Sequence, residues 1–138
     1  MKMAIRSTLV LALLLAVSFV AAARDLESTP QAKVYRASLK AIADGDYAAY
    51  TKCMMSEAVQ EIEKQTKEMG KTPKDGMELL KAMAPSDVKF TDLKVDGKKA
   101  VLRATGKQDK EVMYGAIDLA QENGQWKVGR QSWSNKKQ

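Results

Sequence analysis

The chain has 138 residues, with 23 Lys and Arg against 17 Asp and Glu, a formal net charge of +6, no His and one Cys. Without His and with a single Cys, it lacks the side chains of common zinc sites and of an internal disulfide, so we expect no metal, no cofactor and no disulfide. The basic residues are dispersed among acidic ones, for example around Lys64 and Lys67. Dispersed charge of both signs is typical of solvated helix faces and argues against nucleic-acid binding.

The N-terminal segment has the pattern of a secretory signal. Lys2 and Arg6 precede an apolar run over residues 9–20, and Ala21-Ala22-Ala23 then supplies small residues before Arg24. This order predicts a signal peptide over residues 1–23 that is cleaved, which leaves one domain over 24–138 in a periplasmic or secreted location. The alternative is a retained membrane anchor, but the run is short of the ~20 apolar residues that span a bilayer. We therefore expect no membrane association after cleavage.

Capping residues and apolar periodicity predict four helices in the first half of the domain. Thr29 or Ser28 precedes Pro30, Asp46 follows Gly45, and Thr72 precedes Pro73, each a typical helix boundary. The predicted helices span residues 30–44, 47–55, 56–69 and 73–84. Cys53 falls in the apolar second segment, and we expect it to be a small buried residue rather than an interchain disulfide or a nucleophile.

After Pro85 the apolar pattern changes from helical to alternating, which predicts four strands. The first spans 88–95 with a bulge at Thr91-Asp92, and Asp96-Gly97 is a hairpin signal before a strand at 99–105. A polar loop is expected over 106–110, then a strand at 112–121. Asn123-Gly124 forms the next hairpin, and the last strand, 126–133, bends at Gly129. Helices followed by an antiparallel meander predict an α+β fold.

The order of these parts resembles a known superfamily. A helix ending in Ala43-Asp44-Gly45-Asp46-Tyr47, more helices, and a meander closing on Asn123-Gly124-Gln125-Trp126-Lys127-Val128 with a terminal Trp133 resemble NTF2-like proteins, in particular small exported bacterial members of unknown function. The resemblance covers about residues 30–134. It implies N-terminal helices packed on a strongly curved four-stranded antiparallel sheet that forms a cone, whose mouth is often a pocket.

Two sets of residues are candidates for that pocket. Met and aromatic side chains pack adaptably and give large contact areas, so they could line an apolar cavity or simply fill a core. They are Tyr47, Tyr50, Met54, Met77, Phe90, Met113, Trp126 and Trp133. Tyr114, Asp118 and Arg130 are candidate polar groups at the pocket edge. Tyr114 and Asp118 share a strand face but lie roughly 13 Å apart along it, too far for a hydrogen bond between them.

Fold does not determine function, so several functions stay open. Related enzymes that isomerise ketosteroids or dehydrate small molecules use pocket Asp, Tyr or His groups, and a chain without His lacks the commonest general base. We therefore expect a non-enzymatic exported binding protein that takes a small apolar ligand in the cone or a protein partner on the sheet. The alternatives are an immunity or inhibitor protein that neutralises an envelope-acting toxin, and a Tyr/Asp isomerase or dehydratase. The oligomeric state stays open, a dimer included.

Overall fold

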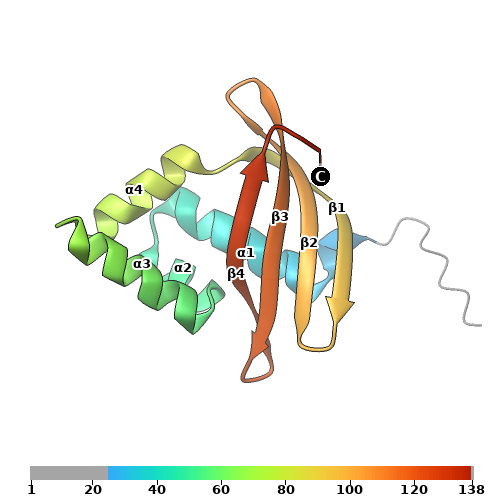
Figure 1. Ribbon diagram of the computed structural model, residues 1–138, viewed down its shortest axis with the longest axis horizontal. Coiled ribbons are helices and arrows are strands. Elements are labelled where there is room, and N and C mark those ends of the chain that lie inside the picture. Colours follow the sequence, from blue (N-terminus) through green and yellow to red (C-terminus); the bar gives the residue numbers. More distant parts are fainter. Residues whose placement is uncertain (1–24, 138) are drawn as a thin grey trace, which may run out of the picture.

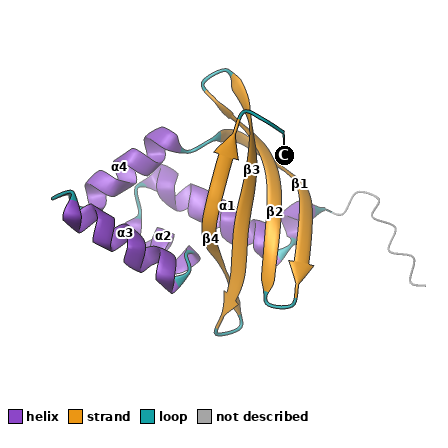
Figure 2. Ribbon diagram, in the orientation of Figure 1, coloured by secondary structure: helices purple, strands orange, loops and turns teal. Residues whose placement is uncertain are grey.

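The computed structural model describes residues 25–137, so the predicted signal peptide lies outside the described residues. The described chain is helical in its first half and a sheet in its second (Figures 1 and 2). A 3₁₀ turn at Leu26–Ser28 leads into the helices, which are α1 (Pro30–Asp44), α2 (Tyr47–Cys53), α3 (Ser56–Glu68) and α4 (Pro73–Met83). The strands are β1 (Ser86–Asp96), β2 (Lys99–Gln108), β3 (Glu111–Glu122) and β4 (Gln125–Ser134). Among residues 25–137, no helix is long and apolar enough to cross a membrane.

The helix boundaries follow the local signals in the sequence. The side chain of Thr29 accepts a hydrogen bond from Ala32 N at the start of α1, and Gly45 ends that helix in the left-handed conformation with a φ of 68°. Asp46 caps α2 through Ala49 N, and Thr72 and Asp75 form a capping box at α4. Each cap satisfies backbone N–H groups that a helix start leaves without partners.

Helix α3 begins differently. Its N-cap residue, Met55, makes no side-chain cap. Glu122, at the end of β3, instead accepts hydrogen bonds from Ser56 N at 2.6 Å and from Ser56 Oγ at 3.0 Å. A carboxylate at a helix N-terminus satisfies free N–H groups and interacts favourably with the helix dipole. This contact fixes one end of α3 to the sheet.

The sheet is an antiparallel meander in the order β1-β2-β3-β4. The predicted bulge in β1 is confirmed by a register shift between Phe90 and Asp92. The predicted polar loop at 106–110 is wrong, because Gly106 pairs with Met113 and the ladder continues to Gln108. The turn needs only two residues, with Asp109 at a φ of 56°, so the polar residues before it stay in the strand.

A second irregularity lies in β4, where a bend at Gly129 was predicted. Leu119 pairs with Val128 but Ile117 pairs with Gln131, so one residue of β3 faces two of β4. The bulge coincides with the segment after α2, where Met55 N donates to Val128 O at 2.8 Å. A Cβ at Gly129 would lie 2.9 Å from Met55 Sδ and 3.3 Å from Asp118 O, so a side chain here would displace the end of Met55 and crowd the backbone of β3.

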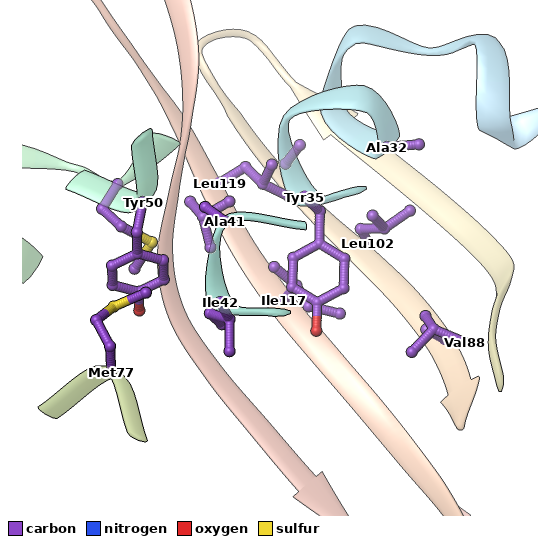
Figure 3. Packing of buried hydrophobic residues seen from close by; sticks show 14 residues of the cluster. Ala32, Tyr35, Ala41, Ile42, Tyr50, Met77, Val88, Leu102, Ile117 and Leu119 are labelled. Carbon is purple, nitrogen blue, oxygen red and sulfur yellow. The ribbon is translucent and has the colours of Figure 1, made fainter. Parts of the chain in front are cut away.

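The core lies between α1 and one face of the sheet, which we call the inner face. Figure 3 shows Tyr35 and Ile42 of α1 beside Leu102 and Ile117 of the central strands. Residues from α2, α4 and all four strands complete it, whereas α3 contributes no buried residue. Figure 1 shows α3 on the β4 side of the sheet, away from its strands. The side chains of α3 and β4 line a concave surface between these two elements.

Candidate functional site

A groove of about 680 Å³ lies between α3 and β4, with the end of α2 beneath it. Three elements supply its lining, and the side chains divide into an apolar floor and a polar rim. The lining residues are Tyr50, Met54, Met55, Glu57, Ala58, Glu61, Ile62, Gln65, Gly129, Arg130 and Gln131. The polar and apolar side chains contribute nearly equal shares of the accessible lining, so the groove is an amphipathic concave surface.

Tyr50 and Met54 form the floor of the groove and are almost fully covered, with exposed fractions of 2% and 6%. Tyr50 projects from α2, and Met54 follows this helix in extended backbone, where it forms a parallel bridge with Val128. Figure 3 shows Tyr50 beside Met77 of α4, which supports the ring from below. Burial raises the pKa of Tyr50, so its hydroxyl stays protonated at neutral pH.

One face of α3 forms the wall opposite the sheet. Ala58 and Ile62 are spaced i, i+4 and are half-buried, so they present one apolar strip to the groove. Glu57, Glu61 and Gln65 follow the same spacing along the rim and are exposed. Gln65 Nε2 donates to Glu61 Oε1 at 2.9 Å. The α3 wall is therefore apolar inside and acidic at its edge.

The other wall is the bulged part of β4. Gln131 faces inward, where its Oε1 accepts hydrogen bonds from Tyr35 Oη at 3.0 Å and from Trp133 Nε1 at 3.2 Å. The Trp133 indole lies over Gly115, where an added Cβ would come within 2.7 Å of the ring. Arg130 is exposed beside Gln131 and, within residues 25–137, makes none of the salt bridges. This wall combines a fixed amide with an exposed positive charge.

The structure does not bring the eight candidate apolar residues into one cavity. Tyr50 and Met54 line the groove, and Met77 is buried in the core below them. The other five are spread over the fold because α1, not a ligand, fills the centre of the inner face. Tyr47 lies against Glu63 of α3, Phe90 packs on Tyr35 under Arg36, Met113 lies near the β2–β3 turn, and Trp126 and Trp133 pack on the core.

Of the three candidate polar residues, Asp118 and Arg130 line a second hollow of about 540 Å³, and Tyr114 lies outside it. Arg130 lies on the rim of the groove, as expected of a pocket-edge residue. Tyr114 and Asp118 face away from α1 on the outer face of the sheet, where they pair with Thr105 and Val101. No hydrogen bond joins Tyr114 to Asp118 among the described residues. They are not part of the groove.

Cys53, expected to be a small buried residue, is half-buried at the end of α2. Burial raises the pKa of its thiol, an effect that the positive charge of Lys127 opposes. A protonated thiol is a poor nucleophile and metal ligand. In residues 25–137, no three His, Cys, Asp or Glu side chains lie close enough together to hold a metal ion.

Sequence reasoning missed Gln131 and the α3 face. Strict alternation from Trp126 and Val128 puts Arg130 inside and Gln131 outside, but the bulge at Gly129 reverses this order. The glycine was a usable signal, since a bulge there places Gln131 and Trp133 on the inner face together. The apolar spacing of Ala58 and Ile62 was also visible, although nothing local showed that this face of α3 would stand apart from the sheet.

Comparisons with known proteins bear on the fold alone. No protein-family model and no curated protein matches the chain. It is similar to an NTF2-like protein of unknown function from Shewanella oneidensis MR-1, with a TM-score of 0.47 and 13% identity over 75% of this chain and 95% of that one. A similar protein from Burkholderia xenovorans LB400, also NTF2-like and of unknown function, gives a TM-score of 0.46 and 13% identity over 79% and 86%.

Proposed function

We propose that this protein is an exported, non-enzymatic binding protein that holds a small, mainly apolar molecule in the groove between α3 and β4. The observation that carries the proposal is the construction of the groove floor. Tyr50 comes from the short helix α2 and Met54 follows this helix. Met54 bridges to Val128, and Met55 N donates to Val128 O, so the positions of both floor residues are fixed before any ligand arrives. Because the floor is already fixed, fewer side chains lose conformational entropy when a ligand binds.

The dimensions and chemistry of the groove support a small molecule as the ligand. A volume of about 680 Å³ is within the range of ligand pockets. Tyr50 and Met54 close the floor but are almost fully covered, so the apolar contact area for a ligand comes mainly from the half-buried Met55, Ala58 and Ile62. Charged groups lie at the rim, where they keep contact with water. The arrangement fits a molecule with an apolar body that enters from solvent.

The same residues support binding rather than catalysis. Acid–base catalysis needs a group whose pKa lies near the working pH and that reaches the reacting atom. Burial raises the pKa of Tyr50 away from neutrality, so its phenol is not a base at pH 7. Tyr114 and Asp118, the pair a Tyr/Asp enzyme would need, lie on the outer face of the sheet. Export is supported by the signal-like pattern of residues 1–23.

The neutral fluorescent probe N-phenyl-1-naphthylamine, whose emission rises in apolar sites, tests this proposal. We expect a saturable rise with the unmodified protein and at least tenfold weaker binding with Ile62→Glu, because a carboxylate would then lie on the apolar strip of α3. Lys64→Glu is the matched control, since it places the same residue at an exposed position on the same helix. Absence of saturable binding, or equal binding by both variants, would contradict the proposal.

A further inference from the structure

Building on the proposed function, we infer that the ligand of the groove carries a hydrogen-bond-accepting oxygen, as in a ketone, an ester or a carboxylate. This oxygen accepts a hydrogen bond from Gln131 Nε2, and the Tyr50 hydroxyl is the second donor. The inference names the chemical class of ligand that the groove selects among apolar molecules of similar shape. It depends on how the amide of Gln131 is oriented.

The orientation of that amide is set by its neighbours. An indole N–H can only donate, so the Gln131 atom 3.2 Å from Trp133 Nε1 must be the acceptor oxygen. The Tyr35 hydroxyl donates to the same oxygen at 3.0 Å. Tyr35 is fully buried, and the Trp133 ring is held over Gly115, so both donors are fixed. The amide oxygen therefore faces the core, and the NH₂ group is on its other side.

The NH₂ group of Gln131 is free to meet a ligand. Among residues 25–137 it donates to no protein acceptor, whereas every fully buried side-chain nitrogen or oxygen in this range has a partner. Nε2 is therefore accessible, and the surface that Gln131 lines is the groove. Two hydrogen bonds to the amide oxygen of Gln131 therefore fix the direction in which its NH₂ group can donate.

The Tyr50 hydroxyl also has no hydrogen-bond partner in the described protein and also keeps some exposure. The ring is 2% exposed and lines the groove, yet its oxygen makes no hydrogen bond to the described protein and is not among fully buried atoms without a partner. The oxygen therefore keeps a small accessible area, and the concave surface that Tyr50 lines is the groove. Burial raises its pKa and keeps the proton on the oxygen, so at neutral pH the hydroxyl can donate. The two donors come from different elements, α2 and β4, that line the same groove.

A matched pair of probes tests the inference. 2-Acetylnaphthalene and 2-ethylnaphthalene share a ring system and a side-chain shape, but only the first has a carbonyl. A groove without placed donors would bind the ethyl compound more tightly, because removing a carbonyl from water is costly. We expect the reverse here, with the ketone binding about fivefold more tightly, the ratio that one net hydrogen bond contributes. 2-Naphthoate distinguishes the sources of the oxygen, since tighter binding than the ketone would indicate a carboxylate held near Arg130.

Gln131→Glu is the informative variant. It keeps an acceptor for Tyr35 and Trp133 but replaces the NH₂ donors with a charged carboxylate oxygen. This charge should weaken the binding of both probes, so the expected result is that the ratio of their affinities no longer favours the ketone. Tyr50→Phe, which removes one hydroxyl, should reduce the preference without abolishing binding. Two outcomes overturn this inference and leave the proposed function intact. In the first, the unmodified protein binds both probes but favours the ethyl compound. In the second, the preference for the ketone over the ethyl compound persists in Gln131→Glu. Failure of both probes to bind overturns the two together.

Discussion

Replacing Gln131 with Leu should destabilise the fold through the buried hydroxyl of Tyr35. The variant removes the one acceptor shared by Tyr35 Oη and Trp133 Nε1. Tyr35 is fully buried and also has Trp133 within hydrogen-bond reach, but an indole N–H cannot accept, so the hydroxyl proton would lose its acceptor at a cost of about 1–3 kcal/mol. Trp133 is only half-buried and lies within hydrogen-bond reach of the Tyr35 hydroxyl, so the free-energy cost of losing the acceptor at its N–H is smaller. We expect a net loss of about 2 kcal/mol, and a fall in Tm of roughly 8 °C for a domain of this size.

Urea unfolding of a double-mutant cycle measures this cost. Tyr35→Phe removes the hydroxyl that Gln131→Leu leaves without an acceptor, so the double variant should be more stable than Gln131→Leu alone by about 1 kcal/mol. In the unmodified background the same Tyr35→Phe change should instead destabilise. A double variant that is no more stable than Gln131→Leu would refute the reasoning, since it would mean that the Tyr35 hydroxyl does not depend on Gln131.

Three further predictions concern other parts of the chain. Gly115→Ala should cost about 1–3 kcal/mol in urea unfolding, because the new methyl group would push Trp133 off the strand; a neutral effect would mean that the ring has free room. The hydrogen bonds from Thr72 lower the pKa of Asp75 in the folded protein. The ionised Asp75 therefore stabilises the fold at pH values above roughly 3.9, the pKa of Asp in the unfolded chain, and this stabilisation is lost as the pH falls through the lower pKa of the folded state. Thr72→Ala should therefore raise the pKa of Asp75 in an NMR titration and reduce stability more at pH 7 than at pH 2; an unmoved pKa would contradict this. N-terminal sequencing of exported protein should find Arg24 first, whereas recovery of the whole chain in membranes would favour the anchor.

Much of the fold could be predicted because its boundaries depend on local chemistry. Thr29, Gly45, Asp46 and Thr72 act on backbone groups a few residues away, so their meaning is visible in a short stretch of sequence. The same holds for the bulge in β1. The β2–β3 turn was misplaced because polar residues near a turn are compatible with either a loop or exposed strand ends, and local pattern does not separate the two.

The site could be predicted only in part because it depends on contacts distant in sequence. Tyr50 and Met54 were candidates from their residue types, but the groove exists because Glu122 holds the start of α3 from a strand 66 residues away. The role of Gln131 depends on a bulge that changes which residues of β4 face inward. Neither arrangement leaves a periodic signal in the sequence. The choice of candidates by residue type alone therefore assigned to one pocket several residues that lie in other parts of the fold.

The most direct test of the account is an amide NMR titration of the isotopically labelled protein with 2-acetylnaphthalene. The account predicts saturable shifts concentrated at the end of α2, along the face of α3 that carries Ala58 and Ile62, and at residues 129–131, with little change on the outer face around Ala116. Shifts concentrated on that outer face, or no saturable shifts at all, would contradict the claim that the groove between α3 and β4 is the binding site.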